Sequence, residues 1–132
     1  MNITVIGAGA WGTAIAISLS ASHRVTLWSI DAAQIEAMRA LRFNQSFLPD
    51  IPLPENLNLS ADLSAALNGA ELVIVAVPVA ALRSVLKEIA QLPGRFGVIW
   101  VCKGFEAETS LLPHQVAAEV LPGEFPRGVL SG

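Results

Sequence analysis

The stretch VIGAGAWGTA, residues 5–14, constrains the fold more than any other part of the sequence. An apolar run enters it, glycines stand at positions 7, 9 and 12, and an alanine-rich run follows. In a strand–turn–helix unit, the first glycine permits a sharp turn and the third lets the helix pack closely on the strand, whereas a side chain at the second would keep a pyrophosphate away from the backbone. The stretch predicts either a tight structural corner or a phosphate-binding turn, and its position between strand and helix favours the second.

The composition indicates a sheet that is buried on both faces. Hydrophobic residues make up 53% of the 132 residues and charged residues only 14%. Glycine, proline or a charged residue interrupts every apolar run before the roughly 18 residues that a membrane span requires. The N-terminal segment lacks the basic start of a signal peptide, so we expect no export signal. With a single cysteine in the chain, the cytoplasm is the expected compartment. Parallel strands covered by helices on both faces read as continuous apolar runs, which accounts for the composition.

Predicted strands and helices alternate along the chain, which indicates an α/β fold. The predicted strands are 3–7, 25–28, 57–60, 72–77, 97–102 and 128–132, and the predicted helices are 10–21, 31–41, 61–68, 79–91 and 109–121. Right-handed crossovers make this a Rossmann-like, doubly wound, mainly parallel sheet with helices on both faces. Residues 43–56, which contain three prolines, are predicted to form an ordered loop.

Charge and cysteine content disfavour several classes of site. The net charge is −3 and no cluster of Lys or Arg stands out, so we expect no nucleic-acid partner. The single cysteine, Cys102, has no companion for a disulfide or a metal site, and we interpret it as a small core residue. His23 and His114 have no partner at metal-ligand or general-base spacing, so we expect both to be structural or surface residues and no metal to be bound.

Asp31 has two interpretations, which the sequence leaves open. A dinucleotide-binding fold places an acidic residue about 20 residues beyond the glycine turn, where it binds the adenosine ribose. The segment Asp31-Ala-Ala-Gln34 is also a good helix start, with Asp31 as N-cap and Gln34 three residues later. One carboxylate can serve both roles.

A series of short motifs runs along the whole chain. They are GAGAWGTA (7–14), VTLW (25–28), NQSFLP (44–49) with PENL (54–57), VAVP (75–78) with Arg83, KGFE (103–106) with Thr109, and the terminal LSG (130–132). In this order, they resemble the NAD(P)-dependent glycerol-3-phosphate dehydrogenases of the bacterial type. Related Rossmann reductases share the first motif but lack the pair formed by NQSFLP and KGFE.

The resemblance implies an oxidoreductase that interconverts sn-glycerol 3-phosphate and dihydroxyacetone phosphate by hydride transfer with NAD(P), in support of phospholipid biosynthesis. In the family, the catalytic lysine and the residues that hold the substrate phosphate lie in a helical second domain. We therefore expect residues 1–132 to be the NAD(P)-binding domain of a truncated chain, with no catalytic residue of its own and little activity alone. The full-length protein is expected to be a homodimer.

The resemblance also assigns candidate binding residues. Those matched to the cofactor site are Gly7, Gly9, Ala10, Trp11, Gly12, Phe47, Pro78 and Lys103, and those matched to substrate contacts are Lys103 and Gly132. Independently of the family, Lys103 follows a predicted strand and should emerge at its carboxyl end, where ligands of open α/β sheets bind. An ammonium beside a carbonyl oxygen would stabilise the negative charge that develops there. The role of Arg83 stays open.

The second predicted strand bears on the choice between NAD(H) and NADP(H). Many family members carry a basic residue just after the LW of this strand, whereas this chain continues with Ile30 and Asp31. A carboxylate here would repel a 2′-phosphate and accept hydrogen bonds from a free 2′-hydroxyl, which favours NAD(H). Arg24 and Arg42 are the basic residues that would favour NADP(H) if they reached the site.

Two other functions are compatible with the same motifs. One is a stand-alone nucleotide-binding or redox-sensing module without catalysis. The other is a reductase that acts on a different ketone, such as an α-keto acid, on the same scaffold.

Overall fold

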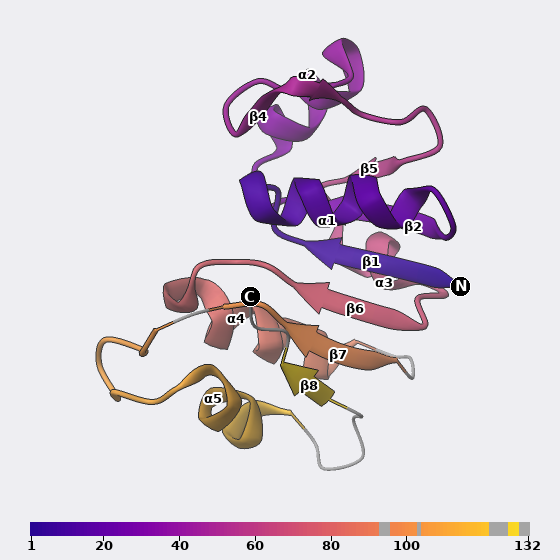
Figure 1. Ribbon diagram of the computed structural model, residues 1–132. Helices are drawn as coiled ribbons and strands as arrows, with labels where there is room; N and C mark the ends of the chain where they lie inside the picture. The colour runs from indigo at the N-terminus through magenta and orange to yellow at the C-terminus, as the bar shows by residue number, and fades with distance from the viewer. Residues whose placement is uncertain (93–95, 103, 122–126, 130–132) are drawn as a thin grey trace.

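The computed structural model describes residues 1–92, 96–102, 104–121 and 127–129. Within these residues, a six-stranded sheet has the order β5-β2-β1-β6-β7-β8, and all its pairings are parallel. The strands are β1 (Asn2–Ile6), β2 (Arg24–Trp28), β5 (Asn58–Ser60), β6 (Leu72–Val75), β7 (Gly97–Trp100) and β8 (Arg127–Val129). The sheet grows in opposite directions from β1, with β2 on one side and β6 on the other (Figure 1).

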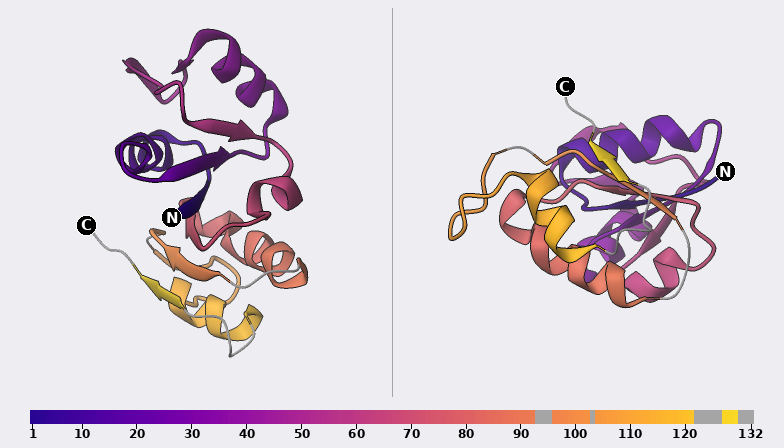
Figure 2. Two further views of the ribbon diagram at one scale, coloured as in Figure 1. Left: turned by 90° about the vertical axis from the view of Figure 1, so that its right-hand side faces the viewer. Right: turned by 90° about the horizontal axis from the view of Figure 1, so that it is seen from below.

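Helices cover both faces of the sheet, as the alternation predicted. α1 (Ala10–Ser20) and α2 (Ala32–Leu41) contribute to the core on one face. α3 (Leu63–Leu67), α4 (Val79–Gln91) and α5 (Pro113–Val120) contribute to the core on the other. The end-on view of Figure 2 shows α1 on one side of the strands and α3 and α4 on the opposite side. The Rossmann-like, doubly wound fold is thus confirmed.

The two cores explain the apolar composition. Along β1, Val5 points into the core beneath α1, whereas Ile6 points into the core beneath α4, and both side chains are fully buried. Each such side chain contributes roughly 1.5–3 kcal/mol of transfer free energy to folding. Because successive residues of a strand face opposite sides, a strand covered on both faces must be apolar throughout.

The loop predicted over 43–56 is in part wrong. β3 (Phe43–Asn44) and β4 (Leu48–Pro52) pair antiparallel and form a separate two-stranded ribbon. Pro49 and Pro52 lie in β4, where proline is tolerated because both strands of an isolated pair are edges. The buried Leu53 anchors the ribbon to the core that α1 and α2 share.

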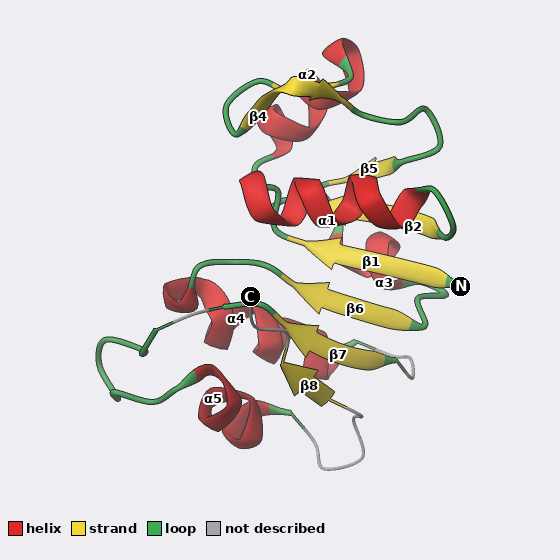
Figure 3. Ribbon diagram, viewed as in Figure 1, coloured by secondary structure: helices red, strands yellow, loops and turns green. Residues whose placement is uncertain are grey.

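Element boundaries also differ from the predictions (Figure 3). α5 begins at Pro113 rather than at residue 109, since proline is suited to the first turn of a helix and the preceding residues form a turn with Ser110 at φ 59°. β6 and β7 end two residues earlier than predicted. Of the strand predicted over 128–132, residues 130–132 lie outside the described part of the chain.

In the described part of the chain, no helix combines the length and the apolar character needed to cross a membrane.

Candidate functional site

A cleft of about 980 Å³ lies at the carboxyl ends of the central strands. It occupies the point where the sheet order reverses between β1 and β6, which is where open α/β sheets bind ligands. Its walls are the glycine turn after β1, residues 28–31 after β2, residues 76–79 after β6, and Val101 and Cys102 after β7. Phe47, from the turn between β3 and β4, and Gln34, from α2, also line the cleft, as do Ala81, Ser84 and Val85 of α4.

Two of the three glycines are required by the fold. Gly7 has φ +112°, and a Cβ there would lie 2.6 Å from the carbonyl oxygen of Ala76. A Cβ on Gly12 would lie 2.0 Å from the carbonyl oxygen of Gly7. The first and third glycines therefore allow β1, β6 and the start of α1 to approach one another, as the spacing predicted.

The second glycine is different, because nothing in the fold requires it. Gly9 has an ordinary extended backbone, with φ −75° and ψ −173°, and a Cβ there would meet no described atom within 4 Å. Gly9 is also the N-cap of α1, and no side chain caps the helix. The N–H groups of the first turn have no carbonyl partner inside the helix, and the helix dipole makes this end positive. Gly9 thus leaves the first turn of α1 open to the cleft.

A buried amide network supports the turn from behind. The carbonyl oxygen of Ala8 accepts hydrogen bonds from Asn44 Nδ2 at 2.9 Å and from Gln34 Nε2 at 2.8 Å. Asn44 Nδ2 also donates to Thr13 Oγ1 at 2.8 Å. In the sequence, Asn44 stands out only as part of the NQSFLP motif and Gln34 only as a residue of a predicted helix start. No local signal marks either contact, because the partners lie 36 and 26 residues apart in the chain.

Asp31 is an N-cap and also lines the cleft. Its Oδ1 accepts a hydrogen bond from the Gln34 N–H at 3.1 Å, which confirms the helix-start interpretation. Gln34 does not complete a capping box, since its side chain instead bonds Ser29 and Ala8. The ribose-binding role of Asp31 stays a prediction. Ile30, beside it, is 85% exposed.

The two arginines considered for a 2′-phosphate lie outside the cleft. Arg24 begins β2, at the opposite end of the sheet from the cleft. Arg42 donates through Nη2 to the carbonyl oxygens of Pro54 and Leu57. Neither lines the cleft.

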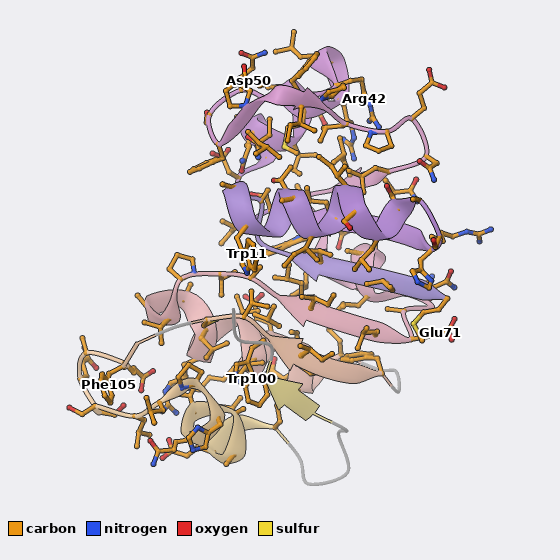
Figure 4. The ribbon with its side chains drawn as sticks, viewed as in Figure 1. Trp11, Arg42, Asp50, Glu71, Trp100 and Phe105 are labelled. Atoms are coloured by element: carbon orange, nitrogen blue, oxygen red, sulfur yellow. The ribbon has the colours of Figure 1, made fainter. Side chains whose placement is uncertain are left out.

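Two exposed aromatic side chains border the cleft. Trp11, in the first turn of α1, is 56% exposed, and Phe47 is 52% exposed. Figure 4 shows Trp11 at the start of α1, beside the ends of β1 and β6. Ala10 and Pro78 also line the cleft, Pro78 as the N-cap of α4. The cofactor residues predicted in the described part of the chain therefore share one cleft. Lys103 and Gly132 lie outside the described residues.

Cys102 lines the cleft as a protonated thiol. Its Sγ lies 3.0 Å from the carbonyl oxygen of Val77, to which it donates. Burial raises the pKa of this thiol to about 11, so it carries no thiolate at neutral pH. This supports the interpretation of Cys102 as a packing residue rather than a nucleophile. Across the described residues, no group of three or more His, Cys, Asp or Glu side chains could hold a metal ion.

Arg83, whose role the sequence left open, fastens the segment after β7. Its guanidinium donates to both carboxylate oxygens of Glu106, at 2.8 and 3.0 Å, and to Glu119 at 2.8 Å. The hydrogen bonds from Arg83 and Thr109 lower the pKa of Glu106 to about 2, and the same ion pairs raise the pKa of Arg83.

Comparisons with known proteins agree with this geometry. A family model described as NAD-dependent glycerol-3-phosphate dehydrogenase N-terminus matches residues 2–132. The chain is 52% identical to a glycerol-3-phosphate dehydrogenase [NAD(P)+] of Thiobacillus denitrificans and 53% identical to one of Nitrosomonas eutropha. All 132 residues align in both comparisons, but they span only 40% of each relative's length.

Solved structures show the same similarity. The crystal structure of a glycerol-3-phosphate dehydrogenase from Coxiella burnetii superposes with a TM-score of 0.91 at 34% identity, over 99% of this chain and 40% of that one. A glycerol-3-phosphate dehydrogenase structure from Plasmodium falciparum gives a TM-score of 0.84 at 25% identity, over 100% of this chain and 40% of that one. The glycine turn, the cleft and these matches lead to one conclusion: the chain belongs to the NAD-dependent glycerol-3-phosphate dehydrogenase family and corresponds to its N-terminal region.

Proposed function

We propose that the cleft binds NAD(H) or NADP(H), with the diphosphate against the first turn of α1. The observation that carries this proposal is Gly9, which faces open space although the fold does not require a glycine there. The N-terminal turn offers unpaired N–H groups and a positive dipole to an anion. Gly7 and Gly12 keep the turn compact, while Ala10 and Trp11 line the cleft beside it.

The adenosine ribose is proposed to lie at Asp31. The Asp31 side chain uses Oδ1 for the helix cap, and the residue lines the cleft after β2. A carboxylate at this place repels a 2′-phosphate, and neither Arg24 nor Arg42 lines the cleft to offset that repulsion. These features favour NAD(H) over NADP(H).

The activity we propose is the interconversion of glycerol 3-phosphate and dihydroxyacetone phosphate, which supplies a precursor of phospholipids. Family membership favours it over the two alternatives, a binding module without catalysis or a reductase of another ketone. When bound, the cofactor supplies or accepts the hydride. Phe47 and Pro78 border it, and Lys103 and Gly132 are the proposed substrate contacts, from the resemblance alone.

The remaining parts of the site are proposed to come from outside this chain. The chain spans 40% of the relatives' length. From the family resemblance, we propose that the catalytic lysine and the substrate-phosphate site belong to a helical second domain. We also propose that the complete protein is a cytoplasmic homodimer. A lone thiol with a raised pKa, Cys102, suits a reducing compartment.

Fluorescence titration of NADH into the complete natural chain tests the dinucleotide proposal. Gly9→Val places a side chain in the open space, so we expect the Kd for NADH to rise at least about tenfold, or about 1.4 kcal/mol. Ala118→Val, on the exposed face of α5, places the same valine side chain away from the cleft and should leave the Kd unchanged. An unchanged Kd in Gly9→Val would overturn the proposal.

A further inference from the structure

We propose that Asn44 and Gln34 are positioning residues for the diphosphate, acting on it through the Ala8–Gly9 peptide. Asn44 does not line the cleft, whereas Gln34 lines it beside the proposed ribose site. This inference rests on the proposed binding of a dinucleotide at the glycine turn. It concerns two side chains from separate elements, since Asn44 belongs to β3 and Gln34 to α2. Both converge on one atom, the carbonyl oxygen of Ala8.

The Asn44 side chain lies in the protein interior. It is 1% exposed, and its amide is fully engaged with described partners. Nδ2 donates to Ala8 at 2.9 Å and to Thr13 at 2.8 Å, while Oδ1 lies 3.5 Å from Gln34 Nε2. Burying an amide costs free energy unless its hydrogen bonds are replaced, so this side chain is held in one orientation by its contacts.

These contacts set the direction of the Gly9 N–H. A trans peptide is planar, so the N–H of Gly9 points opposite to the carbonyl of Ala8. Asn44 and Gln34 hold that carbonyl on the inner side of the turn. The Gly9 N–H is therefore directed away from both amides, and Gly9 lines the cleft. Donors that are oriented before the ligand arrives bind it at a lower cost in ordering.

Asn44 also braces the far side of the same turn. Thr13, which accepts its second hydrogen bond, is fully buried, and the Thr13 N–H makes the first bond of α1 to the Gly9 carbonyl at 3.0 Å. One amide thus contacts the residue before Gly9 and the residue that closes the first helical turn. The N–H groups between them, which would face the diphosphate, are fixed as a unit.

The same two residues connect the turn to the other walls of the cleft. The Phe47 N–H donates to the carbonyl oxygen of Asn44 at 3.3 Å, so the turn that carries Phe47 starts from Asn44. Gln34 Oε1 accepts from the Ser29 hydroxyl at 2.8 Å, and that hydroxyl in turn accepts from the Asp31 N–H at 3.1 Å. The proposed ribose, diphosphate and aromatic contacts are thus joined by one neutral network.

The test compares ligands with and without a diphosphate. Asn44→Ala and Gln34→Met each remove one donor to Ala8. Thr4→Val is the matched control, because Thr4 is 2% exposed and its hydroxyl donates to the Ala66 carbonyl at 2.6 Å, away from the cleft. In the complete natural chain, Kd values for NADH and ADP-ribose are measured by titration, and those for adenosine by ligand-observed NMR, below the melting temperature of every variant.

We expect both variants to weaken the binding of NADH and ADP-ribose about tenfold, as is typical when residues that orient binding groups are removed. Asn44→Ala should weaken adenosine binding less than twofold. Gln34→Met should weaken adenosine binding more than Asn44→Ala does but less than it weakens ADP-ribose binding, because Gln34 also bonds Ser29 beside the proposed ribose site. The Thr4→Val control should lower the melting temperature without changing any Kd. Unchanged ADP-ribose binding in both variants would overturn the inference, and so would an equal loss for adenosine. If the unsubstituted protein binds neither NADH nor ADP-ribose, the proposed function itself fails. Gln34 is only half-buried, so Gln34→Met decides the question if Asn44→Ala does not fold.

Discussion

Two segments that leave the carboxyl ends of the sheet are held in opposite ways. The glycine turn after β1 is fixed by buried, uncharged hydrogen bonds from Asn44 and Gln34. The segment 104–111 after β7, which extends outward in Figures 1 and 4, is fastened by Glu106 to Arg83, which also pairs with Glu119. The hydrogen bonds that hold the glycine turn involve no titrating group, whereas the ion pairs that hold the segment 104–111 should weaken at low pH and at high salt.

The largest expected effect is a difference in protein stability between substitutions at two glycines of the turn. Gly12→Val should destabilise the protein by more than about 3 kcal/mol, because its Cβ would lie 2.0 Å from the Gly7 carbonyl oxygen and the backbone would have to move. Gly9→Ala should cost about 1 kcal/mol or less, since its Cβ meets open space. Urea denaturation measures both. Similar losses in the two variants would contradict the division between structural and ligand-facing glycines.

The next largest effect is a change in cofactor preference on substitution of Asp31, whose charged carboxylate lies beside the network of neutral amides. Asp31→Asn keeps a side chain that caps α2 but removes the negative charge. We expect the ratio of the NADH and NADPH affinities to shift about tenfold towards NADPH, because the repulsion of the 2′-phosphate is lost. The melting temperature should stay nearly constant. Parallel titrations measure the ratio, and an unchanged ratio would contradict the proposal that Asp31 lies at the ribose.

A pH series tests the charged segment. Because the folded pKa of Glu106 is about 2, below its ordinary value of 4.5, its carboxylate stabilises the fold above about pH 4.5. That stabilisation is lost as the pH falls from 4.5 through 2. Glu106→Gln should therefore be less stable than the unsubstituted protein at pH 7, and the difference should shrink at pH 3.

The control for this series is Glu108→Gln. Glu108 is an exposed acid in the same segment, and the described residues give it no ion pair. Its substitution should change stability little at either pH. A Glu106→Gln difference that is equal at pH 7 and pH 3 would show that the ion pair does not stabilise the fold.

The smallest effect is the response to salt. Raising NaCl from about 0.05 to 1 M shortens the screening length from more than 10 Å to about 3 Å, which weakens exposed ion pairs. The stability of the unsubstituted protein should therefore depend on salt more than that of Arg83→Met. Asn44→Ala should keep the salt dependence of the unsubstituted protein. Equal salt dependence in all three, from urea midpoints, would erase the contrast between the two segments.

Much of the fold could be predicted because its signals are local. β1, β2, β6 and β7 follow from continuous apolar runs, and the spacing of Gly7, Gly9 and Gly12 identified the turn. The ribbon of β3 and β4 was missed because its short strands contain prolines and lack a repeating apolar pattern. The start of α5 was placed too early because helical periodicity does not mark the preceding turn at Ser110.

The candidate site, like the fold, has features that local sequence predicts and features that only long-range contacts determine. Sequence alone predicted the glycine turn, since glycine is required where a Cβ would collide with neighbouring backbone. Only the tertiary structure decided what holds that turn in place, and it also revealed the partners of Arg83. Asn44 is 36 residues from Ala8, and Arg83 is 23 residues from Glu106. Contacts at such separations arise from the packing of whole elements, which no local pattern of residues encodes.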